Sequence, residues 1–239
     1  MRLKRLKAKL IQGVRKNILL SVSVVLLILT IDQILKIWIK TSFAYNDPSV
    51  NLIGDWFKLN YVENQGMAFG ATLGGGVWGK LILSLFRIIA IGGIIYYLIA
   101  QIKRNAKKEF IVVISLVLAG ATGNLIDSLF YDLVFDVDYC IQFNQLADSG
   151  IWKECNYGYG YIEQVEVRQT GFLFGNVVDM FQFDATWPNW VPWLGGRQVF
   201  PAIWNFADSS ISIAVIIILF RQKKYFKKEE PTKTDDQPA

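Results

Sequence analysis

Histidine is absent from this sequence of 239 residues. Its absence excludes hydrolases that pair a serine or a cysteine with histidine, and it excludes metallopeptidases built on the HExxH motif. Most zinc chemistry is excluded as well, because histidine is one of the usual zinc ligands. Acid–base chemistry near neutral pH must therefore use Asp, Glu, Lys or Tyr side chains.

Cysteine is nearly as scarce, since the chain contains only Cys140 and Cys155. Two thiols cannot form a four-ligand metal cage by themselves, and we expect no metal site. Both cysteines lie in a polar segment that we expect outside the membrane, where a disulfide can form. Nothing in the sequence sets the distance between them, so a disulfide and two free thiols are equally open.

Charged residues make up only 19% of the chain, whereas hydrophobic residues make up 53%. The hydrophobic residues are bunched into long runs, which indicates a membrane protein. A helix needs about 20 residues to cross the hydrocarbon core. We therefore predict an all-α polytopic membrane protein with four transmembrane helices, a small extracytoplasmic β-sheet and an extended outer insertion. The predicted spans are residues 17–39, 77–101, 110–130 and 202–220.

The net charge of +5 is unevenly distributed along the chain. Lys and Arg concentrate before the first hydrophobic run, between the second and third, and after the fourth. Such residues accumulate on the cytoplasmic side, so we expect cytoplasmic termini and two outer connections. This pattern also argues against a nucleic-acid partner. We expect one domain over residues 1–239, with a disordered charged tail at 227–239.

The two outer connections differ in character. Residues 56–62 alternate and are rich in aromatics, and a turn signal follows at 64–66, so we expect a small sheet on the membrane surface. The second connection contains an acidic insertion at about 131–175, which could cap a site, contact a partner or contact lipid. Trp187, Trp190 and Trp193 fit an aromatic layer at the outer interface, and the alternative is an ordinary loop with exposed aromatics.

Ionisable residues in or beside the expected spans are the strongest functional signal, because charges are costly in lipid. Asp32 and Lys36 lie four residues apart in the outer half of the first span. Asp127 lies near the outer end of the third span, and Asp208 lies in the first two turns of the fourth. The orientation above places all of them on the outer side of the bilayer.

The pattern Asn-x-x-Asp occurs three times in this chain. On a helix this spacing puts both side chains on one face, so each amide could hold the carboxylate three residues later. The spacing alone is weak evidence, but its recurrence at the edges of expected spans strengthens it. The three pairs are Asn124 with Asp127, Asn176 with Asp179, and Asn205 with Asp208.

Five sequence elements resemble, in order, the motifs of lipoprotein signal peptidases (signal peptidase II), which are aspartyl peptidases. The resemblance covers nearly the whole chain except the tail and the middle of the second outer connection. The matching elements are Ile31–Lys36 (D-x-x-x-K), Asn64–Phe69 (N-x-G-x-A/S-F), Gly120–Asp127 (G-x-x-G-N-x-x-D), Val177–Met180 (V-V-D-F) and Phe200–Asp208 (F-P-x-F-N-x-A-D).

This resemblance implies an endopeptidase in the bacterial cytoplasmic (inner) membrane, with its active site at the outer face. It implies a diacylglyceryl-modified prolipoprotein as substrate, cut just before the lipidated cysteine, contact with membrane lipid, no cofactor, and inhibition by globomycin-type cyclic peptides. The catalytic pair would be Asp179 and Asp208. Supporting or substrate-binding positions would be Asp32, Lys36, Asn64, Gly66, Asn124, Asp127, Asn176 and Asn205.

The chain departs from the family pattern in two places. Ser128 follows Asp127 where the family usually has Arg, so a cation is missing or comes from elsewhere, for example from Arg168 or Arg197. Asp127 and Asp179 are also 52 residues apart, much farther than is usual in the family, which marks the outer insertion.

Two neighbouring carboxylates cannot both ionise easily, so such a pair supplies one general base and one general acid. The two roles belong to the coupled pair and are not assigned to individual residues.

Asp32 with Lys36 could instead be a structural ion pair, and Asp127 could brace helices. Alternative functions are a non-catalytic lipid- or lipoprotein-binding protein and a cation-coupled transporter. A transporter predicts charge through the membrane depth, whereas the middles of spans two and three carry only Arg87.

Overall fold

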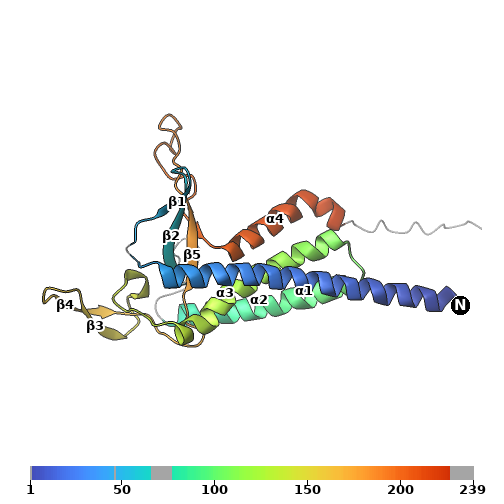
Figure 1. The fold of residues 1–239 in the computed structure, drawn as a ribbon, viewed down its shortest axis with the longest axis horizontal. Helices are drawn as coiled ribbons and strands as arrows, with labels where there is room; N and C mark the ends of the chain where they lie inside the picture. The colour runs from blue at the N-terminus through green and yellow to red at the C-terminus, as the bar shows by residue number, and fades with distance from the viewer. Residues whose placement is uncertain (1, 46, 66–76, 227–239) are drawn as a thin grey trace, which may run out of the picture.

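The computed structural model describes residues 2–45, 47–65 and 77–226, with side chains from residue 9 onward. The predicted contribution of Gly66 and the predicted disorder of the tail lie outside these residues. Within them, the long helices lie side by side and the strands lie at one end of the bundle (Figure 1). The helices are α1 (Arg2–Ser42), α2 (Val77–Lys103), α3 (Lys108–Val134) and α4 (Phe206–Tyr225).

Three of these helices are long and apolar enough to cross a membrane, namely α1 from residue 9, α2 and α3. The fourth helix, α4, begins four residues later than the predicted span at 202–220. The reason is local, because Ile203–Trp204 form strand β6 and pair with a neighbouring strand. Asn205 then caps the helix, accepting a hydrogen bond from the backbone of Asp208 at 2.9 Å.

A four-stranded antiparallel sheet crosses the end of the bundle, roughly perpendicular to the helices (Figure 1). The predicted strand character of residues 56–62 is confirmed from Phe57 onward, and Trp56 lies in the turn before the strand. An all-α class is not confirmed, because this sheet and a separate hairpin are integral to the fold. In spatial order the strands of the sheet are β1 (Val50–Ile53), β2 (Phe57–Asn64), β5 (Val177–Phe183) and β6 (Ile203–Trp204).

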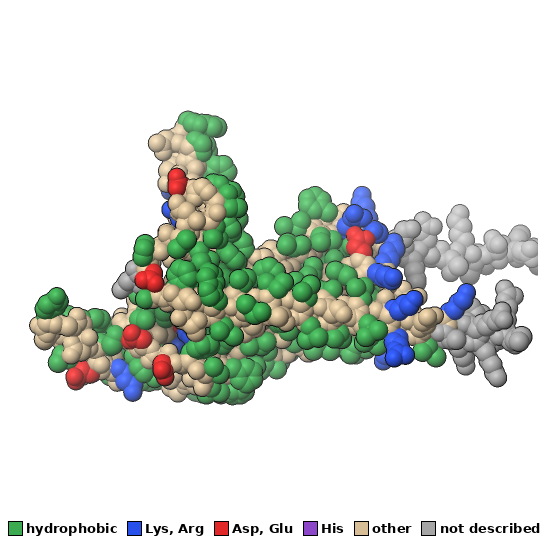
Figure 2. Space-filling view, viewed as in Figure 1, with side chains coloured by type: hydrophobic (Ala, Val, Ile, Leu, Met, Phe, Trp, Pro, Cys, Tyr) green, Lys and Arg blue, Asp and Glu red, His purple; other side chains and the backbone are tan. Residues whose placement is uncertain are grey.

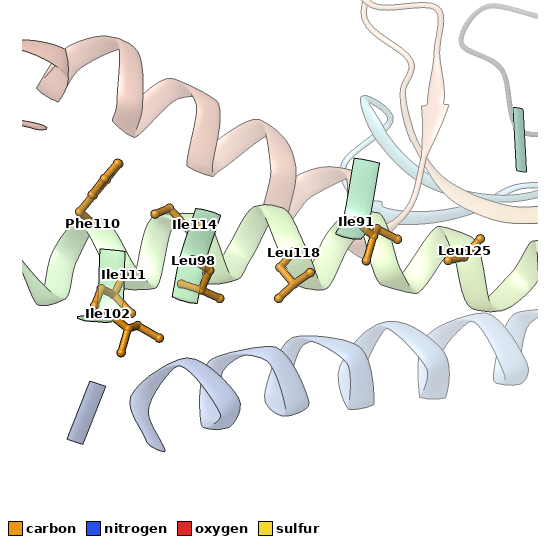
Figure 3. Close-up of a cluster of buried hydrophobic side chains, with 8 residues drawn as sticks. All are labelled: Ile91, Leu98, Ile102, Phe110, Ile111, Ile114, Leu118 and Leu125. Atoms are coloured by element: carbon orange, nitrogen blue, oxygen red, sulfur yellow. The ribbon is translucent and has the colours of Figure 1, made fainter. Parts of the chain in front are cut away.

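Apolar side chains pack the second half of α2 against α3 (Figure 3). Ile91, Leu98 and Ile102 of α2 recur at helical spacing and meet a row that includes Phe110 and Leu118 of α3. The outward faces of the helices remain apolar, which gives the bundle its hydrophobic surface (Figure 2). Since lipid tails are as apolar as these side chains, close packing and polar contacts must hold the bundle together.

Two glycines allow α3 to approach its neighbours closely. A Cβ atom at Gly120 would press against the backbone carbonyl of Ala207 in α4 and lie 2.6 Å from Ser210 Oγ. A Cβ atom at Gly123 would lie 2.6 Å from Asp32 Oδ2 of α1. Small residues at these positions therefore bring α1 and α4 against the same stretch of α3.

The outer insertion forms a small folded module rather than a loose loop. It contains a short 3₁₀ helix, η2 (Gln142–Asn144), and a hairpin of β3 (Trp152–Asn156) and β4 (Ile162–Glu166). A disulfide joins Cys140 to Cys155, with the two Cα atoms 5.4 Å apart, which resolves the open question about these thiols. Cys155 packs with Val165 and Val167 in a core of its own. The helix α3 runs to Val134, four residues into the predicted insertion.

Replacing both cysteines by serine should loosen this module. Closing a loop of about 15 residues is worth about 3 kcal/mol, so transient opening should become roughly 100-fold more frequent. Trypsin cleavage after Lys153 in the folded protein should accelerate accordingly, and wild-type protein treated with a reductant should behave alike. Equal cleavage rates for the variant and the oxidised wild type would contradict this expectation.

Substitution Gly120→Ala should force α4 away from α3 and destabilise the protein by about 1–3 kcal/mol, the usual cost of overpacking. The matched control is Gly92→Ala, because a Cβ atom at Gly92 of α2 meets nothing within 4 Å. Thermal unfolding in detergent should therefore distinguish the two variants. The close-packing argument is wrong if both variants unfold at the same temperature.

Candidate active site

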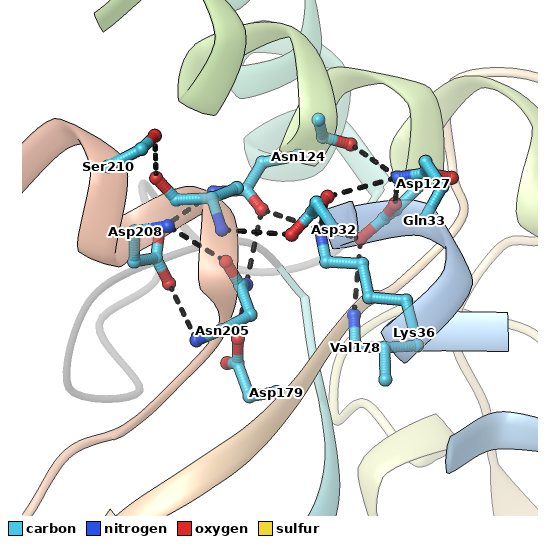
Figure 4. Close-up of polar contacts among 12 residues, drawn as sticks. Asp32, Gln33, Lys36, Asn124, Asp127, Val178, Asp179, Asn205, Asp208 and Ser210 are labelled. Atoms are coloured by element: carbon cyan, nitrogen blue, oxygen red, sulfur yellow. Dashed lines mark hydrogen bonds and ion pairs between the residues drawn. The ribbon is translucent and has the colours of Figure 1, made fainter. Parts of the chain in front are cut away.

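The two candidate catalytic carboxylates meet at the junction between the sheet and the helical bundle (Figure 4). Asp179 lies on β5, and Asp208 lies in the first turn of α4. Asn205 joins them, because its side-chain Nδ2 donates to Asp179 Oδ1 at 2.7 Å and its backbone N–H donates to Asp208 Oδ2 at 3.4 Å. Asp179, which is 26 positions before Asn205 in the chain, is thereby brought beside the start of α4.

Each carboxylate also receives a second hydrogen bond, donated by a side-chain amide. Asn124 of α3 donates through Nδ2 to Asp208 Oδ1 at 2.7 Å. Asn64, at the end of β2, donates through Nδ2 to Asp179 Oδ2 at 3.3 Å. Amide donors hold the rotamer of a carboxylate and support its charge without adding a further charge to the site.

Behind the amides lies a fully buried ion cluster. Lys36 Nζ lies 2.7 Å from Asp127 Oδ2 and 3.1 Å from Asp32 Oδ2, and none of these side chains reaches solvent. Lys36 therefore does not extend toward a membrane surface. Its ammonium also donates to Asn124 Oδ1 at 2.9 Å, which connects the ion cluster to the amides of the site.

The remaining oxygens of the cluster are satisfied by polar groups from several elements. Gln33 Nε2 donates to Asp127 Oδ1 at 3.0 Å and to Asp32 Oδ2 at 3.1 Å. The backbone N–H of Ala207, at the start of α4, donates to Asp32 Oδ1 at 2.8 Å. Asp32 thus binds a backbone N–H in the first turn of the helix that carries Asp208, an arrangement that the helix dipole favours.

The amides do not pair as the Asn-x-x-Asp spacing predicted. Asn124 donates to the aspartate of another triplet, Asp208, and Asn205 donates to Asp179. Asn176 does not lie on a helix at all, because it precedes strand β5, where residues three apart face opposite sides. Its side chain donates to Glu63 at 3.3 Å. The expectation that each side-chain amide donates to the carboxylate of its own triplet is therefore wrong. Asn205 and Asp208 do pair, but each side chain binds the backbone N–H of the other residue.

A cation does lie beside Ser128, but it comes from an unexpected element. Arg87 of α2 donates through Nη1 to Ser128 Oγ at 3.0 Å. The suggestion that Arg168 fills this role is wrong, because its guanidinium binds both oxygens of Asp132 at 2.6 and 2.9 Å. Arg197 lies in the loop between β5 and β6. The single charge in the middle of the second predicted span was the signal that could have identified Arg87.

A cavity of about 870 Å³ opens beside the two carboxylates. Asp179 and Asp208 line it together with Arg87, so its polar end holds two acids and a cation. Most of the remaining wall is apolar and follows α4 through Ile213 and Ile216. The cavity therefore combines a small polar end with a long apolar wall.

Burial raises the pKa of the Asp179 carboxyl group to about 7, and the negative charge of Asp208 is the next largest cause. Hydrogen bonds donated by Asn205 and Asn64 act in the opposite direction. Asp179 is 4% exposed, in agreement with burial as the main cause. Near neutral pH this carboxyl group can therefore exchange a proton, as a general acid or base requires.

The structure brings together nearly all of the predicted site residues within the described ranges, and Asn176 stands apart as a support of β5. Gln33, which bridges the two carboxylates of the ion cluster, was missed, because an amide inside a hydrophobic run carries no distinctive pattern. Across the described residues, no group of three or more His, Cys, Asp or Glu side chains is arranged to hold a metal ion.

Known proteins are similar to this chain over most of its length. A family model described as signal peptidase (SPase) II matches residues 24–223. The lipoprotein signal peptidase of Porphyromonas gingivalis is 40% identical over 203 residues, which cover 82% of this chain and 80% of that protein. The lipoprotein signal peptidase of Amoebophilus asiaticus is 33% identical over 208 residues, covering 84% of this chain and 76% of that protein.

A solved structure described as a bacterial membrane enzyme superposes with a TM-score of 0.50 at 24% identity. It covers 86% of this chain and 94% of its own, and the likeness concerns the fold alone. The long apolar helices and these matches describe a multi-pass membrane protein. Because the family match spans most of the chain and a relative at 40% identity covers it equally well, the protein belongs to the signal peptidase II family.

Proposed function

We propose that this protein is an aspartic endopeptidase that removes signal peptides from diacylglyceryl-modified prolipoproteins, cutting before the lipidated cysteine. One observation carries the aspartic assignment: Asp179 and Asp208 line the same cavity and both hydrogen-bond to Asn205. The substrate class follows from the relatives, which are lipoprotein signal peptidases.

In the proposed reaction, the ionised carboxylate of the pair takes a proton from a water molecule as that water attacks the scissile carbonyl carbon. The protonated carboxyl group donates a hydrogen bond to the oxygen on which negative charge develops. Its proton then passes to the leaving amine nitrogen as the carbon–nitrogen bond breaks. This sequence uses no metal and no covalent intermediate, and amides rather than metal ligands surround the two carboxylates.

The cavity suits a substrate that is part lipid and part peptide. Its apolar wall runs along α4 from Asp208 past Ile213 to Ile216, so acyl chains can lie there while the scissile bond stays at the polar end. Globomycin-type cyclic peptides would inhibit the enzyme by occupying the same space.

We further propose that α4 is the fourth span and that both termini are cytoplasmic, with the sheet and the active site at the outer face. Lys and Arg side chains gather at the bundle end that holds the N-terminus, as cytoplasmic ends do (Figure 2). The disulfide of the opposite end fits an oxidising compartment outside the cytoplasm. Buried polar contacts join the insertion to α3 through Asp132 and to the residue before β5 through Asn176, which supports a single domain.

Replacing either acid by its amide, Asp179→Asn or Asp208→Asn, should lower kcat by about 10²–10⁴-fold, because each variant removes one proton-transfer group while keeping the side-chain shape. The assay is the release of signal peptide from a lipid-modified precursor by purified protein in detergent. The control is Asp55→Asn, because Asp55 is an exposed acid in the turn between β1 and β2. This variant should cleave the precursor at the wild-type rate. Wild-type cleavage by either active-site variant would exclude an aspartic peptidase and favour a non-catalytic binding protein.

Activity should fall as the pH rises through about 7. The elevated pKa of Asp179 means that the carboxyl pair loses its last shared proton in this range, and the general acid disappears with it. A profile of kcat/KM against pH should show a basic limb with a midpoint near 7, and Asp55→Asn should leave it in place. An activity that stays constant from pH 6 to about 9 would argue against a dyad that shares a proton.

A further inference from the structure

The outer insertion contacts Asn176, the residue before the active-site strand, through buried polar side chains, a feature that the peptidase chemistry does not use. We name residues 136–170 the disulfide module, since Cys140 and Cys155 close it. Two of its side chains, Asn144 and Arg168, are each only 2% exposed. Buried polar groups of this kind cost free energy unless they are fully hydrogen-bonded, so their contacts define how the module attaches.

Arg168 fastens the module to the end of α3. Its guanidinium binds both carboxylate oxygens of Asp132, a bidentate geometry that fixes orientation as well as distance. The same group donates to the backbone oxygen of Phe174 at 2.9 Å. Its Nε donates to Asn144 Oδ1 at 2.7 Å. One side chain thus joins the module, α3 and the segment that leads into β5.

Asn144 carries this connection to the residue before β5. Its Oδ1 accepts a second hydrogen bond from Asn176 Nδ2 at 3.0 Å. Asn176 is itself 1% exposed, and its Oδ1 accepts from Lys80 of α2 at 2.6 Å. Its Nδ2 also donates to Glu63 of β2. The Asn176 amide therefore has three hydrogen-bond partners, and one of them, Asn144, belongs to the module.

The place at which β5 begins determines where Asp179 points. Val177 pairs with Asn64 and Asp179 pairs with Val62 across the β2–β5 ladder. A one-residue slip of this register would turn Asp179 to the opposite face of the sheet. Much smaller shifts also matter, because a displacement of about 1 Å can cost roughly 10²-fold in rate.

We propose that the disulfide module is a positioning element for the active site, in which Asn144 and Arg168 hold Asn176 and thereby fix β5 and the Asp179 carboxylate relative to Asp208. This inference rests on the proposed function, which makes Asp179 catalytic. Asn144, Arg168 and Asn176 act through Asp179 and are positioning residues.

The test measures kcat and KM of the full-length protein with a lipid-modified precursor. Asn144→Ala removes the shared acceptor but leaves the Arg168–Asp132 ion pair, and it should lower kcat by about 10-fold or more with KM within about twofold of wild type. Asn144→Asp keeps an oxygen that can accept both bonds, beside the positive charge of Arg168. It loses the donor that Asn144 Nδ2 supplies to the Asp138 carbonyl at 2.7 Å, so it should restore part of kcat. A rescue of this kind would not follow from a general loss of stability.

Two further variants provide a second test of the positioning role and a control. Arg168→Lys keeps the charge opposite Asp132 but cannot reach Asn144 and Phe174 at once, so kcat should again fall. Tyr159→Ala alters the fully exposed tip of the β3–β4 hairpin and should behave as wild type. If Arg168→Lys fails to fold, Asn144→Ala alone decides the question.

Wild-type kcat for Asn144→Ala overturns the inference, and so does a change confined to KM, which would indicate a substrate contact instead. A loss of kcat that Asn144→Asp does not rescue also counts against it. Asp179→Asn is measured in the same assay. If that variant is inactive while Asn144→Ala is normal, only the positioning role fails; if Asp179→Asn is active, the proposed function itself fails.

Discussion

A single buried ammonium group, that of Lys36, determines the direction of the hydrogen bonds in the polar network. Lysine has donors and no acceptor, so the amide group of Asn124 must turn its oxygen toward Lys36 and its nitrogen toward Asp208. The same Asn124 oxygen accepts from Asn205 Nδ2 at 3.1 Å. The Oδ1 atom of Asn205 is thereby left to cap the backbone of Asp208. One cation thus orients both amides so that their N–H groups face the two proposed catalytic carboxylates.

This network serves the fold and the site at once. Asp32 and Lys36 come from α1 and Asp127 comes from α3. Asp32 also accepts a hydrogen bond from the backbone N–H of Ala207 in the first turn of α4. Asp127 Oδ2 also accepts from the backbone of Val178 in β5, at 3.4 Å. Breaking a buried ion pair typically costs about 3–5 kcal/mol, and in lipid no hydrophobic force between helices compensates. The contacts that hold the helices together are therefore the contacts that bring the carboxylates to one place.

The same physical requirement explains how this chain accommodates its departures from the family pattern. A cation is needed beside carboxylates in a poorly solvated cavity, and Arg87 supplies it from α2 where Ser128 has no charge. The disulfide module likewise buries Arg168 only because Asp132, Asn144 and Phe174 satisfy its donors. Beside Ser128 the positive charge is retained, while the element that provides it changes.

The sequence by itself determined the hydrophobic helices, the strand at 57–64 and the residues that could form the site. These features depend on local composition, spacing and motif, which act along the chain. The partners of the asparagines, the source of the cation and the pairing of Cys140 with Cys155 were decided only by the tertiary structure. An amide or a guanidinium binds whatever group folding brings within about 3 Å. For Asn124 and Asn205, that choice depended on how closely Gly120 and Gly123 let α1 and α4 approach α3, a distance that no local pattern contains.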